Sequence, residues 1–153
     1  MSEGSILAGT RIGHVHLTVS DLERSITFFK DLPGFELTMR YENEAAFLSA
    51  GGYHHHIGLN TWESKDGDPP GPGSTGLYHL ALVYPTRRDL AVAVKRLVDE
   101  DWPISGASDH GVSEAVYLND PDGNGIELYR DRVERGWGTP WQTPTPATSP
   151  WRA

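Results

Sequence analysis

The sequence predicts an α+β domain in which two βαβββ modules form a cupped, partly open mixed-sheet barrel. Three observations support this fold class: a strand, a helix and three strands follow one another twice, a Gly- and Pro-rich stretch separates the two series, and His14 and His79 occupy matching places in them. The predicted organisation has an arm at 1–9, a first module at 10–62, a linker at 63–75, a second module at 76–133 and a Pro- and Trp-rich tail at 134–153.

The first module begins with Ile12–Val19, which alternates apolar and polar residues and is therefore expected to be a strand. Asp21 is a suitable N-cap for the helix that follows, whose apolar residues recur at helical spacing. This helix should end near Asp31, because Pro33 and Gly34 interrupt it. Strands are then expected at 35–41, 44–49 and 54–61.

The second module repeats this order from Leu77–Tyr84, which is again expected to be a strand. Thr86 can cap a helix from Arg87 to Asp99, and three strands are expected at 104–107, 114–119 and 125–130. Beyond it, the tail is either mobile or anchored against the domain or a partner by its tryptophans, Trp137, Trp141 and Trp151.

Composition excludes several classes of function. The 153 residues carry a net charge of -8, which disfavours nucleic acid as a partner because an acidic protein repels phosphate backbones. There is no cysteine, so a metal would have to bind histidine and carboxylate side chains. The sequence has neither a long apolar run nor a basic, signal-like N-terminus. We therefore expect a cytoplasmic protein that does not associate with a membrane.

The strongest candidate site is a metal centre made of His14, His79 and Glu127. The two histidines open matching strands, and Glu127 lies near the start of the last strand, after the turn at 120–124. Two imidazoles and one carboxylate are the ligands of non-haem Fe(II) or Mn(II) sites, which leave the opposite face open for substrate and oxygen. A single histidine on a strand could equally be a satisfied core or surface residue. The matching positions of His14 and His79 in the two modules favour the metal site.

Residues 12–130 resemble the vicinal oxygen chelate superfamily, which includes glyoxalase I, bleomycin- and fosfomycin-resistance proteins and extradiol ring-cleaving dioxygenases. The resemblance rests on segments in both modules, namely Gly13–Ile26, Phe28-Phe29, Leu77–His79 and Asp120–Leu128. Since this fold carries several reactions and also non-enzymes, it implies the paired-module fold more firmly than any one activity.

The stretch His110–Glu127 is similar to the extradiol dioxygenase signature, from which the chain departs slightly at Ser108. This similarity implies a non-haem Fe(II) dioxygenase that uses O2 to cleave a catechol-like aromatic diol, with Mn(II) or another divalent metal possible. It also implies that Tyr117 and His110 hydrogen-bond the metal-bound diol or the developing oxyanion.

The segment His54–Leu59 is similar to the strand that carries the catalytic acid/base of these enzymes. Aligning Gly58 selects His55 as the residue that takes a proton from the diol, whereas a slip of one residue would select His54 or His56. His16, on the same strand face as His14, is either a pocket-wall residue or a plain surface histidine.

Two alternatives remain beside the dioxygenase. A glyoxalase-like metalloenzyme uses a fourth ligand, a Glu on the strand before the linker, and the strand expected at 54–61 has no carboxylate. A bleomycin-resistance-like protein that sequesters a drug at a dimer cleft needs no metal, and the presence of the His, Tyr and Glu set argues against it. Classical extradiol enzymes contain two copies of the paired module, so this chain is expected to form a homodimer, with each metal site completed by one chain or by two.

Overall fold

The computed structural model describes residues 4, 6–7 and 9–132, which divide into two compact units. The first unit takes in the chain up to Lys30 and Phe35–Gly67, and the second takes in Asp31–Gly34 and the chain from Asp68 onward. The predicted tail at 134–153, with its three tryptophans, lies outside the described residues, as do positions 1–3, 5 and 8 of the predicted arm.

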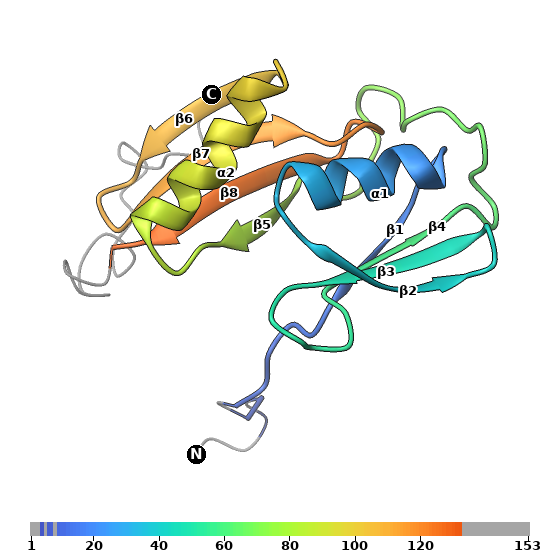
Figure 1. Cartoon of the computed structure of the whole chain (residues 1–153), viewed down its shortest axis with the longest axis horizontal. Helices are drawn as coiled ribbons and strands as arrows, with labels where there is room; N and C mark the ends of the chain where they lie inside the picture. Colours follow the sequence, from blue (N-terminus) through green and yellow to red (C-terminus); the bar gives the residue numbers. More distant parts are fainter. Residues whose placement is uncertain (1–3, 5, 8, 133–153) are drawn as a thin grey trace. The chain divides into compact units, whose positions relative to one another are not determined.

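The first unit is a βαβββ module with a four-stranded mixed sheet (Figure 1). Its strand order is β1-β4-β3-β2, in which β1 is parallel to β4 and the other neighbours are antiparallel. Its elements are β1 (Val15–Thr18), α1 (Leu22–Asp31), β2 (Glu36–Tyr41), β3 (Ala45–Ser49) and β4 (Ile57–Asn60).

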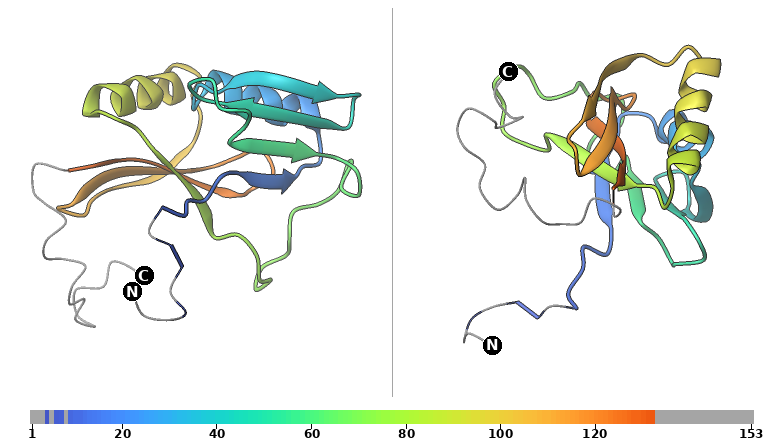
Figure 2. Two further views of the ribbon diagram at one scale, coloured as in Figure 1. Left: turned by 90° about the horizontal axis from the view of Figure 1, so that it is seen from below. Right: turned by 90° about the vertical axis from the view of Figure 1, so that its left-hand side faces the viewer.

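The second unit repeats the same topology (Figure 2), and its strands β5, β7 and β8 are longer than β1, β3 and β4 of the first unit. Its strand order is β5-β8-β7-β6, with β5 parallel to β8. Its elements are β5 (His79–Val83), α2 (Arg87–Asp99), β6 (Ile104–Asp109), β7 (Ser113–Asn119) and β8 (Gly125–Asp131). The predicted α+β class with two βαβββ modules is therefore confirmed. The described strands form two separate sheets and not one closed barrel, and the cup expected between them stays a prediction.

Both helices begin where their capping residues predict. The Asp21 Oδ1 accepts the Arg24 N–H at 3.0 Å, and the Thr86 Oγ1 accepts the Asp89 N–H at 3.2 Å. Each bond satisfies one of the backbone donors that a helix leaves free in its first turn, so the polar cap fixes the start of the helix.

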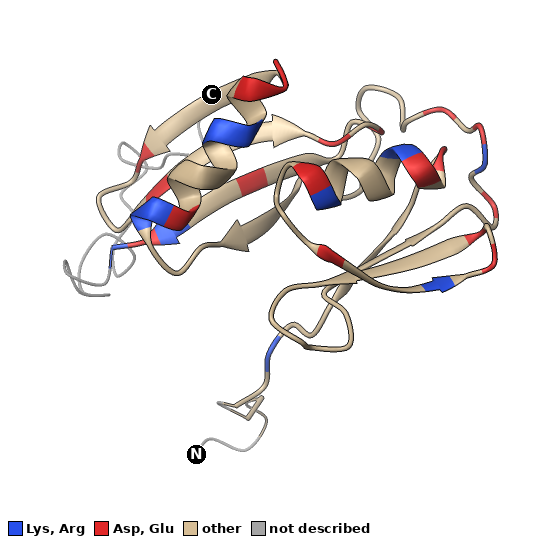
Figure 3. Ribbon diagram, in the orientation of Figure 1, with Lys and Arg blue, Asp and Glu red and all other residues tan. Residues whose placement is uncertain are grey.

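Each unit buries apolar side chains from its helix and from its central strands. In the first unit Phe29, Leu48 and Leu59 are fully buried, and in the second Leu97 and Leu128 are. Burying one such side chain contributes roughly 1.5–3 kcal/mol, so these positions fix which face of each sheet its helix covers. The strands β3 and β4 carry no charged residue, whereas β8 carries the buried Glu127 and the partly buried Arg130 and Asp131 (Figure 3).

The strand expected at 54–61 is shorter in the structure, because β4 spans only Ile57–Asn60. The chain enters it from a turn at Gly51 and Gly52, whose φ values of 68° and 79° suit glycine. The His54 carbonyl then accepts the Thr38 hydroxyl at 3.0 Å in place of a strand neighbour. His54, His55 and His56 consequently precede the strand, and their side chains do not follow a simple alternation.

None of the helices among the described residues is both long and apolar enough to cross a bilayer.

Candidate metal and catalytic site

Glu127 is the centre of a polar cluster in the second unit. It lies on β8 between β5 and β7 and is only 9% exposed. Its Oε2 lies 3.1 Å from the His79 Nε2, and its Oε1 accepts the Tyr117 hydroxyl at 3.2 Å. Each carboxylate oxygen therefore has a partner from a different neighbouring strand.

His110 extends this cluster by one hydrogen bond. Its Nε2 lies 3.0 Å from the Tyr117 hydroxyl oxygen. Since that hydroxyl gives its proton to Glu127, the His110 Nε2–H is the donor in this pair. A tight turn after β6 places His110 there, with Gly111 at a φ of 78° and the His110 N–H donated to the Ser113 carbonyl at 2.9 Å. Two hydrogen bonds and the close His79–Glu127 contact thus join His110, Tyr117, Glu127 and His79 in one line, called the polar line below.

The polar line opens into a pocket of about 600 Å³ that the second unit forms alone. Burial, followed by the charge of Glu127, raises the pKa of Tyr117, so its hydroxyl stays protonated and able to donate at neutral pH. A hydrogen bond with Ser108, which also lines the pocket, acts in the opposite direction on this pKa. Ser108 is a member of the site that sequence reasoning treated only as a departure from a pattern.

The turn before β8 holds Glu127 in register. The Asp120 carboxylate, which is only 4% exposed, accepts the backbone N–H groups of Asp122 and Asn124 at 2.9 and 2.8 Å. Gly125 follows, and a Cβ at this position would collide with the carbonyl oxygen of Tyr78. The close approach of β5 to β8, and with it the pairing of His79 with Glu127, therefore requires glycine here.

In the first unit, His14 precedes β1 and lies against His55. Their ring centroids are 4.4 Å apart, and the Phe47 ring lies 5.0 Å from that of His55. The Nδ1 atoms of His54 and His55 are 2.7 Å apart. Burial and then the neighbouring His14 lower the pKa of His55, which favours its neutral form.

His56 has different partners from His55. Its Nδ1 lies 3.1 Å from the Ser49 hydroxyl, and its ring is 6.5 Å from that of Phe35. Of the three consecutive histidines, His55 has the ring contact with His14, and its role as the acid/base stays a prediction.

His16 lies over Gly58, its partner in the β1–β4 register. A Cβ at Gly58 would come within 2.7 Å of the His16 Nδ1, so the ring occupies the space that a side chain would take. Its other ring neighbours are Phe47 and Trp62, at 5.9 and 5.8 Å. Burial and then His14 lower the pKa of His16.

The predicted metal ligands are divided between the two units, with His14 in the first and His79 and Glu127 in the second. Among the described residues no three His, Asp or Glu side chains form a ready ligand group, so the complete set stays a prediction. The pair in the second unit does fit a metal: adjacent ligand atoms about 2.1 Å from an octahedral ion lie about 3 Å apart, and the His79 Nε2 and Glu127 Oε2 are separated by 3.1 Å.

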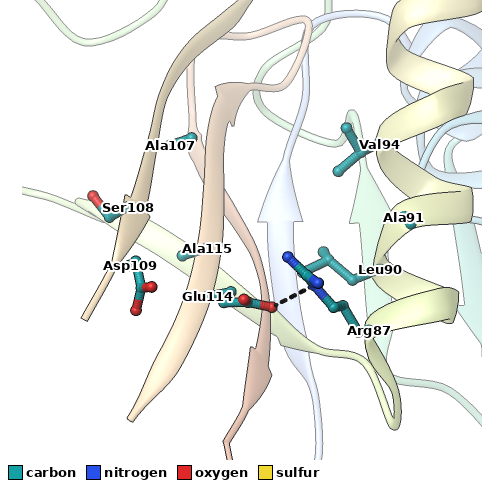
Figure 4. Close-up of a pocket in the computed structure, with 9 residues that line it drawn as sticks. All are labelled: Arg87, Leu90, Ala91, Val94, Ala107, Ser108, Asp109, Glu114 and Ala115. Carbon is teal, nitrogen blue, oxygen red and sulfur yellow. Dashed lines mark ion pairs between the residues drawn. The ribbon is translucent and has the colours of Figure 1, made fainter. Parts of the chain in front are cut away.

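A second pocket of about 450 Å³ lies between α2 and the strands β6 and β7 (Figure 4). The charged residues at one end of this pocket form ion pairs, in which Glu114 lies 2.9 Å from Arg130 and 3.2 Å from Arg87. Hydrogen bonds from Arg130 and Arg132 lower the pKa of Glu114 to about 2. The remaining lining is largely aliphatic, so this pocket offers packing and no ligand set for a metal.

Comparison with known proteins gives a family model and several relatives. The family model described as Glyoxalase/Bleomycin resistance protein/Dioxygenase superfamily matches residues 11–128. The Catechol-2,3-dioxygenase of Bacillus subtilis (strain 168) is 40% identical over 134 residues, which are 87% of this chain and 46% of the relative. The Biphenyl-2,3-diol 1,2-dioxygenase 3 of Rhodococcus globerulus is 32% identical over 79% of this chain and 63% of its own length. The chain thus spans about half of the first relative and under two thirds of the second.

Other similar proteins bear different names. A Probable lactoylglutathione lyase of Vibrio parahaemolyticus serotype O3:K6 is 26% identical over 82% of this chain and 94% of its own length. Among solved structures, a glyoxylase/bleomycin resistance protein/dioxygenase domain from Frankia sp. EAN1pec superposes with a TM-score of 0.66 at 23% identity, covering 83% of this chain and all of that domain. The structural likeness bears on the fold alone.

Proposed function

Because the chain belongs to the glyoxalase/bleomycin resistance/dioxygenase superfamily, we propose that it is a metal-dependent extradiol dioxygenase that opens a catechol-like ring. The observation that carries the proposal is the polar line, in which two hydrogen bonds and one close histidine–carboxylate contact join four of the six predicted site residues within the second unit. The names of the catechol and biphenyl-diol relatives support the same reaction class.

The proposed metal ligands are His14, His79 and Glu127, and Fe(II) is the preferred ion with Mn(II) as the second choice. A bound divalent ion of this kind would act as a Lewis acid and bring the two diol oxygens and O2 to one centre. Nitrogen and carboxylate oxygen donors of this set suit both metals.

His55 is the proposed proton acceptor for the diol. Its ring contact with His14 places a neutral imidazole beside a proposed ligand, where one hydroxyl of a bound diol would release its proton. The overall reaction needs no further reductant: the ring carbon–carbon bond beside the diol breaks, and both atoms of O2 enter the ring-opened product.

His110 and Tyr117 are the proposed donors to the negative charge that develops on oxygen. Both side chains line the pocket, where Tyr117 donates to Glu127 at 3.2 Å and His110 lies 3.0 Å from the Tyr117 hydroxyl, and each would turn its proton from this partner to a substrate oxygen. Donors held beside a developing negative charge stabilise it, and such stabilisation is usually the largest electrostatic contribution to catalysis.

Two other functions are less well supported. A glyoxalase-like isomerase would need a carboxylate on β4, where residues 57–60 provide none and the His16 ring covers Gly58. Metal-free sequestration of a drug would not require a buried carboxylate hydrogen-bonded to a tyrosine and paired with a histidine. The lactoylglutathione lyase relative keeps the isomerase as the alternative to test.

The test is to purify the protein without oxygen, load it with Fe(II) or Mn(II), and add catechol and then air. We expect about one metal ion per chain and a yellow ring-opened product that requires both metal and oxygen. A loaded protein that instead isomerises the glutathione adduct of methylglyoxal would support the alternative enzyme. A protein that takes up no metal but binds bleomycin would support sequestration.

We further propose that the working form is a homodimer. Light scattering that shows a monomer at full activity would contradict it. A mixture of His14→Ala and Glu127→Ala chains then tells how each site is completed. If two chains share a site, mixed dimers recover about a quarter of normal activity, because half of the dimers are mixed and each has one intact site. If one chain completes its own site, the mixture stays inactive.

A further inference from the structure

The pocket between α2 and the strands β6 and β7 has the size and lining of a site for a large apolar side chain. Leu90 and Val94 of α2 form one side of it (Figure 4). The strands contribute Ala107 and Ala115, whose small side chains leave a space of about 450 Å³ beside this aliphatic wall. Because protein interiors are otherwise closely packed, an apolar hollow of this size is typical of a surface that another group covers.

The last described residue, Arg132, lies at the charged end of this pocket. Its side chain is 2.7 Å from Asp109 and 2.5 Å from Glu114, and both of these residues line the pocket. Its backbone N–H is donated to the Val112 carbonyl at 2.6 Å. Backbone and side chain thus fix the point from which residues 133–153 continue.

One atom of Arg132 indicates a further contact. Its Nε is buried, and no group within the described part of the chain accepts the hydrogen of this atom. A buried N–H is rarely left without an acceptor. A backbone carbonyl from the segment that follows Arg132 directly is a suitable acceptor.

That segment also supplies a large apolar side chain within reach. Trp137 is the first of its three tryptophans and comes five residues after Arg132. Five extended residues span at most about 17 Å. The part of α2 that lines the pocket, from Arg87 to Val94, covers about 10 Å at 1.5 Å per residue. Trp137 can therefore reach the whole aliphatic wall.

We propose that the segment after Arg132 folds back on this pocket and that the Trp137 indole docks between α2 and the strands β6 and β7. An indole offers a broad apolar face to the aliphatic wall, and its single N–H donor suits the Asp109 carboxylate at the charged end. Gly136 and Gly138 flank Trp137, so the backbone on either side can approach the rim of the pocket closely.

Ser108 connects this pocket with the polar line. It lines this pocket as well as that of the polar line, and it hydrogen-bonds the Tyr117 side chain. A docked indole would therefore rest against the strand that holds Ser108 beside Tyr117.

The test follows the tryptophans of the full chain by fluorine-19 NMR after labelling with 5-fluorotryptophan, with a soluble paramagnetic agent as the probe of exposure. Trp137→Phe and Trp151→Phe samples assign the two signals that are compared. We expect the agent to broaden the Trp137 signal at least about fivefold less than the Trp151 signal, because a docked indole loses most of its contact with solvent.

Ala91→Glu should abolish this protection and bring the broadening of the Trp137 signal up to that of Trp151. Ala91 is an exposed helix position that lines the pocket, and a carboxylate there would be desolvated by a docked indole. Val92→Glu is the matched control, because Val92 is 46% exposed on the same helix and lies outside the pocket lining. It should leave both signals unchanged.

Thermal unfolding is a second measurement, which does not depend on the Ala91 variant. Trp137→Ala should lower the Tm by about 3–6 °C, since the domain loses the packing of one large aromatic side chain. Trp151→Ala should change the Tm by less than about 1 °C.

Equal broadening of the Trp137 and Trp151 signals in the normal chain would overturn the inference, and so would protection of Trp137 that survives Ala91→Glu. Protection that disappears on dilution would show that the pocket takes the segment of a second chain, and would overturn it as well. None of these measurements needs metal, diol or oxygen, so their outcome is independent of the proposed function.

Discussion

The two units have the same strand register but carry different kinds of residue at equivalent positions. With His14 and His79 taken as equivalent, the β1–β4 pair His16 and Gly58 corresponds to the β5–β8 pair Ala81 and Glu127. In the first unit the bulky residue is on the first strand and the partner is glycine. In the second the first strand has alanine, and its partner is the proposed metal ligand. The large side chain of the pair is thus on the first strand in the first unit and on the partner strand in the second. This difference decides which unit can present a carboxylate.

The next strand repeats the contrast. Phe47 pairs with Gly58 in the first unit, and Tyr117 pairs with Glu127 in the second. The residues on either side are the same in both units, since Ile57 and Leu59 correspond to Ile126 and Leu128, and all four are buried. At these positions the two sheets agree on the face toward the core and differ on the other face, so the core face fixes the fold while the other is free to carry function.

The largest expected effect comes from removing the carboxylate, which makes the second unit resemble the first. Glu127→Ala should abolish metal binding and lower turnover by about a thousandfold or more, because a ligand is lost and Tyr117 loses its acceptor. Metal content and catechol turnover measure this. Glu36→Ala, an exposed strand carboxylate, is the control and should retain both. Normal turnover of Glu127→Ala would refute the site.

Tyr117→Phe copies the residue of the first unit into the second. It should keep the metal and lower kcat by about ten- to a hundredfold, since one donor to the developing charge is removed. Tyr84→Phe is the matched control: Tyr84 donates to the Pro33 carbonyl at 3.0 Å, so its loss should cost about 1 kcal/mol of stability and leave kcat unchanged. Equal kcat values for both variants would remove Tyr117 from the mechanism.

The two glycines of the strand pairs should differ in stability. Gly125→Ala sets a methyl group against the backbone carbonyl of Tyr78 and should cost about 2–4 kcal/mol, because strands must separate. Gly58→Ala meets the His16 ring, which can turn away, so the cost should stay near 1 kcal/mol or less. Urea unfolding of both variants measures the difference, and equal costs would mean that the β5–β8 approach is no tighter than that of β1–β4.

The smallest effect is a pH dependence on the other face of the second sheet. Its arginine partners hold the pKa of Glu114 at about 2, below the value of 4.5 it has without them. Its contribution to stability is therefore complete above about pH 4.5 and is lost as the pH falls toward 2. Glu114→Gln should be less stable than the normal chain at pH 7 and should approach it at pH 2 in thermal unfolding. A difference that is independent of pH would show that the ion pairs contribute nothing.

Much of the fold could be predicted because its signals are local. The helix Arg87–Asp99 has the predicted bounds, since Thr86 caps it and its apolar spacing is regular. The start of β4 could not be predicted, because the bond between Thr38 and the His54 carbonyl joins β2 to the segment before β4, far apart in the sequence. Bonds of that kind leave no trace in the periodicity of either segment.

Some features of the candidate site could likewise be predicted from the sequence, and others could not. The polar line could be anticipated from residue types and spacing in one stretch, because Tyr117 and Glu127 lie on adjacent strands of one hairpin. The covering of Gly58 by His16 could not, because it depends on the register of a parallel pair whose strands are far apart in the sequence. Ser108 was missed for another reason: its hydrogen bond with Tyr117 depends on the register of β6 against β7, which shifts between Ile104 and Gly106.

The proposed dioxygenase would insert both atoms of O2 into a catechol-like diol at a metal held by His14, His79 and Glu127. The most direct test of this proposal is mass spectrometry of the product formed from catechol under oxygen-18 gas by the Fe(II)-loaded protein, with the product reduced at once to prevent exchange of its carbonyl oxygen with water. Both inserted oxygen atoms should carry the label. A product that carries one label or none would contradict the proposed reaction.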